Sequence, residues 1–135
     1  MNIHVVAGAL FDASGRVLIT QRPAGKALAG RWEFPGGKLH ADEDAYAGLV
    51  RELREELGVE VHAADPMMRY DVSHAHGTVT LDMWLVREWS GTVAGLDGQA
   101  WKWVEVARLV DEDILEADAP IVAALVARAV EAGGA

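Results

Sequence analysis

The stretch GKLHADEDAYAGLVRELREELGV, residues 37–59, decides the fold of this chain because its apolar residues recur with the period of a helix. Asp42 is a suitable N-cap for that helix, and Gly58 is a suitable stop. We therefore predict an α-helix over about residues 42–57. One sector of this helix carries the apolar residues that we expect to pack on a sheet: Tyr46, Val50, Leu53 and Leu57.

Three glutamates, Glu52, Glu55 and Glu56, occupy the opposite side of the predicted helix. At i, i+3 and i+4 spacing they repel one another, and the helix dipole disfavours anions near the C-terminus. A divalent cation would remove both penalties, because carboxylate oxygens are preferred ligands of Mg²⁺ and Mn²⁺. The alternative is a solvated acidic face on which Arg51 and Arg54 pair with the glutamates.

Apolar runs rich in β-branched residues predict strands on both sides of this helix. The runs His4–Leu10 and Val17–Gln21 are separated by DASG at 12–15, which predicts a β-hairpin. The other expected elements are strands at 32–34, 78–86 and 100–104, a helical turn at 106–109, and a second helix at about 120–130. Mixed strands with helices on the sheet faces predict an α/β or α+β fold, here as one domain over residues 1–135.

Composition excludes several classes of protein. The chain has no cysteine, so disulfides, thiolate catalysis and cysteine metal sites are ruled out. Its formal net charge is −9 and it has no basic cluster, so we expect no binding to a nucleic-acid polymer. No apolar run is long enough to span a bilayer, and Met1–Leu10 lacks the basic start of a signal peptide. We expect a soluble, cytoplasmic protein.

Nine residues of the opening stretch resemble the Nudix box, G-x5-E-x7-R-E-U-x-E-E-x-G-U, where U is a bulky aliphatic residue: Gly37, Glu43, Arg51, Glu52, Leu53, Glu55, Glu56, Gly58 and Val59. The segments QRP (21–23), WEFPGGK (32–38) and ADAP (117–120) also resemble the MutT-like branch, which removes oxidised nucleotides from the pool. The resemblance implies a Nudix-type α/β/α sandwich with a mixed sheet. It also implies a hydrolase that uses Mg²⁺, with Mn²⁺ as a substitute.

The resemblance further implies which groups hold the metal, namely the Glu52, Glu55 and Glu56 carboxylates and the Gly37 carbonyl. Arg51 would pair with Glu43 and brace the helix. A loop acid usually completes such a site, and Asp97 stands at that place although the branch often has Glu there. Asp97 would bind the metal through water, act as the base or only shape the loop.

Four further residues are candidates for substrate binding. Lys38 and Arg22 would contact phosphate, although Arg22 at a strand end would equally suit a surface salt bridge. Phe34 would pack beside the base or belong to the core. Asp118 stands where MutT-like enzymes often carry Asn, and it would read the base or cap the following helix. An ionised Asp only accepts hydrogen bonds, which suits the N7–H of 8-oxoguanine or the amino group of cytosine and disfavours N7 of guanine.

The resemblance implies the reaction NTP + H₂O → NMP + pyrophosphate, with 8-oxo-dGTP as the expected substrate and nucleotide-pool sanitation in DNA repair as the role. Either Glu52 or Asp97 would accept the proton. The first alternative is a CTP or dCTP pyrophosphohydrolase of the same branch. The second is a non-catalytic, nucleotide-binding Nudix module, which is less favoured because such modules often lack box carboxylates and this chain has all of them.

Overall fold

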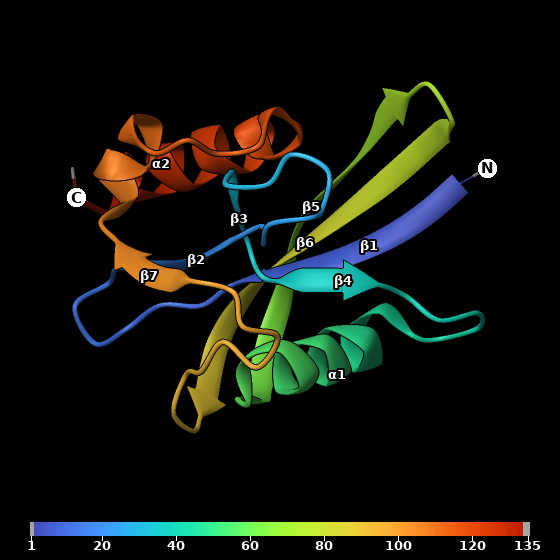
Figure 1. Ribbon diagram of the computed structural model, residues 1–135. Helices are drawn as coiled ribbons and strands as arrows, with labels where there is room; N and C mark the ends of the chain where they lie inside the picture. The colour runs from blue at the N-terminus through green and yellow to red at the C-terminus, as the bar shows by residue number, and fades with distance from the viewer. Residues whose placement is uncertain (1, 134–135) are drawn as a thin grey trace. The chain divides into compact units, whose positions relative to one another are not determined.

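The computed structural model describes residues 2–133, which form two compact units. Figure 1 shows the elements of both units. The first unit contains the residues up to Leu10 and Pro35–Asp97. Its elements are β1 (Asn2–Ala9), β4 (Gly36–Lys38), α1 (Ala45–Leu57), β5 (Glu60–His74) and β6 (Gly77–Ser90). The second unit contains Phe11–Phe34 and the residues from Gly98 onward. Its elements are β2 (Val17–Gln21), β3 (Trp32–Glu33), β7 (Trp101–Val104), the 3₁₀ turns η1 (Val106–Asp111) and η2 (Glu116–Asp118), and α2 (Ala119–Gly133).

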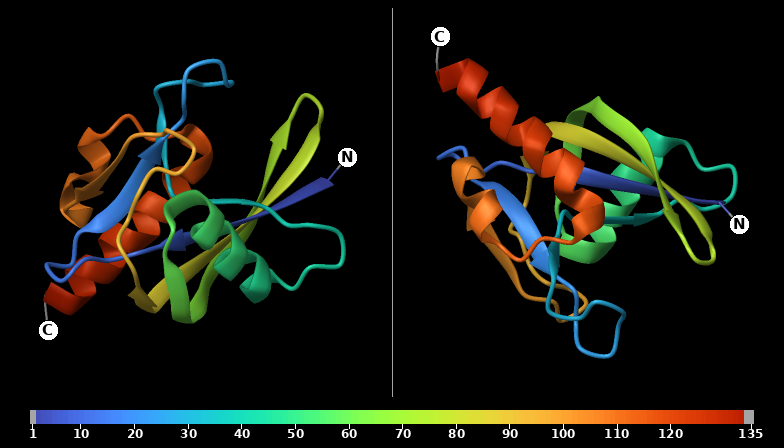
Figure 2. Two further views of the ribbon diagram at one scale, coloured as in Figure 1. Left: turned by 60° about the horizontal axis from the view of Figure 1, so that its bottom comes forward. Right: turned by 90° about the horizontal axis from the view of Figure 1, so that it is seen from above.

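The first unit is built on a four-stranded sheet in the order β4-β1-β6-β5. The β1–β6 pair is parallel, whereas β1–β4 and β5–β6 are antiparallel, so the sheet is mixed as predicted. The helix α1 lies against this sheet (Figure 2) and contacts β1, β4 and β5. This packing fixes the direction in which α1 presents its glutamates.

The helix α1 differs from its prediction at the N-terminus and in its buried stripe. It begins at Ala45, and its N-cap is Asp44, whose carboxylate accepts a hydrogen bond from the Ala47 N–H. The predicted cap, Asp42, has a left-handed φ of 61° and lies outside the helix. The predicted stop is confirmed, since Gly58 adopts φ 72° and donates to the Arg54 carbonyl.

The stripe that α1 buries is rotated slightly from the predicted one. Leu53 and Leu57 are fully buried as expected, and Leu49, which the prediction omitted, completes an i, i+4, i+8 row with them. Tyr46 and Val50 are only half-buried. The Tyr46 ring meets the edge of Trp84 with centroids 5.7 Å apart. Glu52 and Glu56 flank this buried row and are half-buried, whereas Glu55 is exposed.

The predicted hairpin of the first two strands is wrong. The strand β1 pairs with β4 and β6, whereas β2 pairs with β3 and β7 in the three-stranded sheet of the second unit. The turn itself exists, because Asp12 donates its N–H to the Arg16 carbonyl at 2.9 Å and Phe11 forms a single bridge with Val17. Composition predicts both strands, but it does not specify their partners.

The strand β5 has no counterpart among the predicted elements. It is 15 residues long, lies at the edge of its sheet and contains Pro66. Three register shifts interrupt its pairing with β6, between Val61 and Met68. Proline and an irregular pleat hide a strand from pattern analysis, and both are tolerated at an edge because one side of the backbone needs no partner.

In the second unit, α2 is preceded by η1 and η2 and contacts both. It extends over Ala119–Gly133, somewhat longer than the predicted 120–130, and buries Ile121, Val122 and Leu125. No helix in residues 2–133 combines the length and the apolar character needed to cross a membrane.

Candidate functional site

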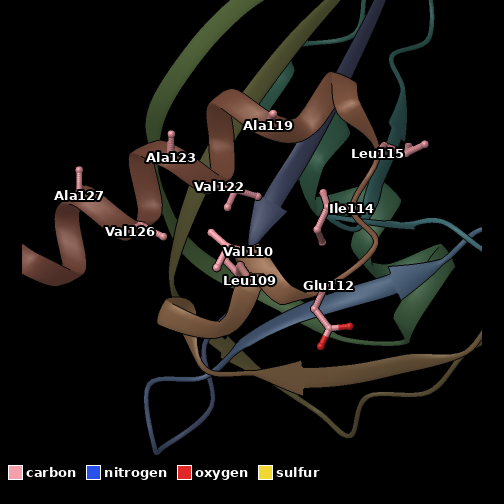
Figure 3. Close-up of a pocket in the computed structure, with 10 residues that line it drawn as sticks. All are labelled: Leu109, Val110, Glu112, Ile114, Leu115, Ala119, Val122, Ala123, Val126 and Ala127. Atoms are coloured by element: carbon pink, nitrogen blue, oxygen red, sulfur yellow. The ribbon is translucent and has the colours of Figure 1, made fainter.

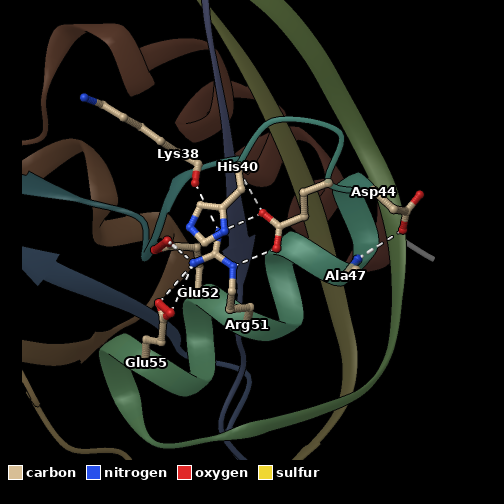
Figure 4. A network of polar contacts seen from close by, with 8 residues as sticks. Lys38, His40, Asp44, Ala47, Arg51, Glu52 and Glu55 are labelled. Carbon is tan, nitrogen blue, oxygen red and sulfur yellow. Dashed lines mark hydrogen bonds and ion pairs between the residues drawn. The ribbon is translucent and has the colours of Figure 1, made fainter.

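The polar network of the first unit is centred on Arg51 (Figure 4). Its guanidinium binds Glu43 in a bidentate manner, with Nε donating to Oε2 at 2.7 Å and Nη2 donating to Oε1 at 2.8 Å. Nη2 also donates to the Lys38 carbonyl at 3.2 Å. The predicted pairing of Arg51 with Glu43 is therefore present. It attaches the residues just before α1 to the middle of the helix and to the end of β4.

Arg51 also reaches the predicted metal ligands. Its Nη1 donates to Glu52 Oε1 at 2.9 Å and to Glu55 Oε2 at 3.0 Å. A single cationic group thus lies between two carboxylates and offsets the repulsion expected from their spacing. Arg54, the other arginine considered as a partner, turns away from this cluster and pairs with Glu60 on β5.

Electrostatics in this cluster favour the charged forms. Hydrogen bonds from Arg51 and from the His40 N–H lower the pKa of Glu43 to about 2. The same contacts, with those to Glu52, raise the pKa of Arg51 well above its ordinary value. Glu43 and Arg51 are therefore a permanently charged pair at any physiological pH.

The glycines before α1 allow the carboxylates to approach the main chain. The Gly36 N–H donates to Glu56 Oε2 at 3.1 Å. A Cβ atom at Gly37 would overlap the Glu52 carboxylate, and one at Gly36 would overlap the backbone of β1. Only glycine therefore leaves room at residue 37 for the glutamate to lie against the peptide group.

The oxygen atoms gathered here are the kind of ligand that a hard divalent cation prefers. The carboxylate oxygens of Glu56 and Glu52 lie against the backbone at Gly36 and Gly37. The positively charged Arg51 Nη1 lies within hydrogen-bond distance of both Glu52 and Glu55, so a cation is already accommodated there. Within residues 2–133, however, no three His, Asp or Glu side chains are gathered in a metal-binding arrangement. Glu52 and Glu55 would have to rotate away from Arg51 to complete one. Arg51 would retain its two-pronged bond to Glu43 during that movement.

The loop that carries Asp97 is attached to the C-terminal turn of α1. The Leu96 N–H donates to the Glu56 carbonyl at 3.1 Å, and the Ala94 N–H donates to the Leu57 carbonyl at 3.0 Å. These bonds satisfy carbonyls that a helix end leaves without partners. Asp97 therefore follows directly on a segment bonded to one of the predicted ligands. Lys38 lies on β4, and its exposed side chain extends away from the network (Figure 4).

The remaining predicted residues belong to the second unit. Arg22 Nη1 binds Glu33 Oε1 at 3.1 Å, and its Nε donates to the Ala27 carbonyl at 2.8 Å. Phe34 is 4% exposed, and its N–H donates to Asp118 Oδ2 at 3.3 Å. Arg22 thus makes the salt bridge that its position at a strand end suggested, and Phe34 is a core residue.

Asp118 is a buried carboxyl group in an unusual environment. Burial raises the pKa of Asp118 to about 7, the Phe34 N–H opposes this rise, and the charge of Glu33 adds to it. Asp118 lies within η2, and its bond to Phe34 leads to the end of β3 rather than to an amide of α2. Asp118 is also the residue that directly precedes α2, which is the position that the helix-capping alternative assigns to it.

Sequence reasoning missed Glu33. This residue is half-buried between Trp32 and Phe34, and burial raises its pKa while the Arg22 guanidinium opposes the shift. The signal was available in the sequence, because Glu33 is a charged residue in the middle of an otherwise apolar or aromatic segment, WEFP. A charge at such a position requires a partner.

The second unit also has an apolar hollow of about 550 Å³ between η1 and α2 (Figure 3). Its walls include Leu109 and Val110 from η1 and Val122, Ala123 and Val126 from α2. None of the candidate metal or substrate residues lines it. The hollow is therefore separate from the chemistry considered above.

Comparisons with known proteins agree with this geometry. The family model described as NUDIX domain matches residues 1–125. The chain belongs to the Nudix family. This Nudix hydrolase is 34% identical over 127 residues to the CTP pyrophosphohydrolase of Escherichia coli, with 94% of each chain covered. It is 30% identical over 123 residues to the 8-oxo-dGTP diphosphatase of the same organism, with 91% of this chain and 95% of the relative covered.

The fold comparison leads to the same branch. A structure from a study of MutT from Aliivibrio salmonicida and Vibrio cholerae matches with a TM-score of 0.85 and 36% identity. The match covers 95% of this chain and 99% of that one. The protein is thus a MutT-like nucleotide pyrophosphohydrolase with the predicted α/β Nudix fold. Nudix hydrolases act on small nucleotide substrates and typically depend on a divalent metal.

Proposed function

We propose that this Nudix hydrolase is a Mg²⁺-dependent pyrophosphohydrolase that converts 8-oxo-dGTP into 8-oxo-dGMP and pyrophosphate before the damaged nucleotide can enter DNA. The observation that carries the hydrolase activity is the Arg51-centred cluster beside Gly37. The family match includes residues of both compact units, which supports the interpretation of residues 1–135 as one Nudix domain.

The metal would be held by the Glu52, Glu55 and Glu56 carboxylates and by the Gly37 carbonyl. Mg²⁺ bound there supplies charge neutralisation for the phosphates and makes water more acidic. Arg51 and Glu43 act as positioning residues, because their two-pronged pair holds the start of the helix against the end of β4.

The other groups have simpler tasks. Glu52 or Asp97 takes the proton of the attacking water. The exposed ammonium group of Lys38 contacts a phosphate oxygen. Arg22 contacts phosphate only if it leaves Glu33, to which it is now bonded.

The choice of base rests on Asp118. A carboxyl group with a pKa of about 7 is largely protonated just below neutral pH, so it can donate through O–H and accept through C=O, as Asn does. 8-Oxoguanine offers an adjacent donor at N7–H and an acceptor at O6, which complement these two groups. Guanine offers acceptors at both places, so one oxygen of the carboxyl would face an acceptor. We therefore assign Asp118 to the base and predict discrimination against dGTP.

A CTP or dCTP pyrophosphohydrolase is the second candidate. Cytosine presents an amino donor that a carboxyl group can bind, and the relative from Escherichia coli with 34% identity is named a CTP pyrophosphohydrolase. Both candidates rely on the same acidic cluster and differ only in the base that Asp118 contacts.

A panel of kcat/KM values for 8-oxo-dGTP, dGTP, CTP and UTP, with Mg²⁺ and with pyrophosphate resolved from phosphate, tests the proposal. We expect 8-oxo-dGTP to exceed dGTP by roughly tenfold to a hundredfold, because a buried hydrogen-bonding group left without a partner costs about 1–3 kcal/mol. Asp118→Ala should collapse this ratio. A preference for CTP over UTP that collapses in the same variant would select the second candidate. Ratios that Asp118→Ala leaves unchanged would refute its assignment to the base.

A further inference from the structure

Two segments of the second unit run side by side. Residues 31–34 include β3, and residues 113–118 lie between η1 and α2. The Trp32 N–H donates to the Asp113 carbonyl at 2.9 Å, and the Leu115 N–H donates to the Trp32 carbonyl at 2.9 Å. These two bonds form one isolated parallel bridge. Because the bridge is so short, the register of the two segments depends on the side chains beside it.

Arg31 binds the second segment next to this bridge. Its Nη2 donates to the Ile114 carbonyl at 2.9 Å. Its Nε lies 2.9 Å from Asp113 Oδ1, close enough for an ion pair, although this N–H is not aligned for a hydrogen bond. A hydrogen bond from a charged donor is stronger than one between neutral groups. The Arg31 side chain is only 29% exposed, which limits competition from water.

The same two segments hold the carboxyl group that we assigned to the base. The Phe34 N–H donates to Asp118 Oδ2 at 3.3 Å, which is long for a bond of this kind. The Asp118 N–H donates to the Leu115 carbonyl at 2.9 Å, so the turn η2 links the position of Asp118 to that of Leu115. A three-residue 3₁₀ turn is not rigid on its own. The position of Asp118 therefore depends on how firmly residues 113–115 are held against β3.

We propose that Arg31 is a positioning residue for Asp118: its bond to the Ile114 carbonyl fixes the register of the two segments and so holds the Asp118 carboxyl where the base is recognised. The inference rests on the proposed assignment of Asp118 to the base. Because Arg31 acts through Asp118, its loss should weaken the selection between bases and leave the metal-dependent step intact.

Selectivity measurements test this role. Arg31→Met keeps most of the side-chain volume and removes the donors, so kcat/KM for 8-oxo-dGTP should fall by about tenfold while that for dGTP changes by less than about threefold. Arg31→Lys restores a charged donor and should return the ratio to within about threefold of wild type. The matched control is Arg16→Met, which removes an ion pair with Asp12 in the same unit and should leave the ratio unchanged. If CTP is the preferred substrate, CTP and UTP replace the two nucleotides.

A double variant separates a failure of this inference from a failure of the proposed function. Asp118→Ala should collapse the ratio, and adding Arg31→Met should then change it no further, because both act through one carboxyl group. If Asp118→Ala collapses the ratio and Arg31→Met alone does not change it, the inference is overturned and the base assignment stands. A further loss in the double variant also overturns the inference. If Asp118→Ala leaves the ratio unchanged, the base assignment is overturned, and hydrogen exchange decides the role of Arg31.

Amide hydrogen exchange tests the positioning without any substrate. The Phe34 N–H is bonded to Asp118, so Arg31→Met should speed its exchange by about tenfold, as Asp118→Ala should. Exchange of the Gly58 N–H, which is bonded to the Arg54 carbonyl in the first unit, should not change. Equal acceleration at both amides would show a general loss of stability and would overturn the inference. A Phe34 amide that exchanges at the wild-type rate in Arg31→Met would overturn it as well.

Discussion

Two carboxyl groups of this protein, Glu43 and Asp118, are placed in opposite environments. Glu43 receives hydrogen bonds from Arg51 and from the His40 N–H, and its pKa falls to about 2. Asp118 is buried near the charge of Glu33, and its pKa rises to about 7. The first group is charged at any physiological pH and can hold a cation fixed in place. The second can exchange a proton near neutral pH and so can both donate and accept.

The contrast extends to the surroundings of the two groups. The first unit gathers Glu52, Glu55 and Glu56 on one helix and offsets their charge with Arg51 and with the backbone N–H of Gly36. In the second unit, Arg22 binds Glu33, and the bond that Asp118 accepts comes from a neutral backbone amide. We infer that the cluster around Arg51, the first region, serves to stabilise charge. The surroundings of Asp118, the second region, serve to discriminate between bases.

The largest effect should come from removing one charge of the first region. Glu55→Gln or Glu56→Gln should lower kcat/KM by about 100-fold or more, because metal catalysis contributes several kcal/mol. The fold should persist, since neither residue belongs to the buried row of α1. The matched control is Glu60→Gln, which removes an exposed carboxylate paired with Arg54. If both site variants turn over like the control in saturating Mg²⁺, the acidic cluster is not the metal site.

A smaller loss should follow from replacing the planar fork of Arg51. Lys cannot donate to both oxygens of Glu43 and to Glu52 at once, so Arg51→Lys should lower kcat by roughly tenfold while the fold is kept. Arg54→Lys alters a similar two-pronged pair, with Glu60, outside the site and should leave kcat near wild type. Steady-state kinetics with circular dichroism would separate the two variants. If both variants keep a kcat near that of wild type, Arg51 is only a surface charge.

The smallest effect concerns stability, and it has opposite signs in the two regions. A carboxyl whose pKa is raised on folding loses stability as pH rises from its unfolded value, near 3.8, to about 7. Asp118→Asn should therefore gain in melting temperature relative to wild type over this window, by several degrees, the change that about 1 kcal/mol produces.

Glu43 should show the reverse trend. Its pKa is lowered, so its contribution is complete above about 4.5 and is lost as pH falls toward about 2. Glu43→Gln should thus be less stable than wild type at neutral pH, and the difference should shrink in acid. Thermal scans of both variants from pH 3 to pH 8 would check this pair of trends. The comparison is contradicted if the difference in melting temperature from wild type changes with pH in the same way for both variants.

Short-range features were the predictable part of this protein. The helix and its Gly58 stop follow from spacings within the 37–59 stretch, and the pairing of Arg51 with Glu43 follows from the resemblance to the Nudix box. The fold class follows from the order of strands and helices and from the family resemblance.

Long-range pairing was not predictable in the same way. Nothing in the sequence near residue 10 indicates that β1 and β2 enter different sheets. The strand β5 was missed because an edge strand with Pro66 does not show regular alternation. The environment of Asp118 depends on Phe34, 84 positions away in the chain, so its protonation could not be read from neighbouring residues.

The position of Arg51 has a consequence for the order of events during folding. A helix that presents three glutamates would resist formation until some cation arrived, as in small zinc domains whose folding waits for the metal. Here the chain supplies positive charge to Glu52 and Glu55 from the residue just before them. Formation of the helix therefore does not have to wait for a cation, and a metal can be bound after the chain has folded.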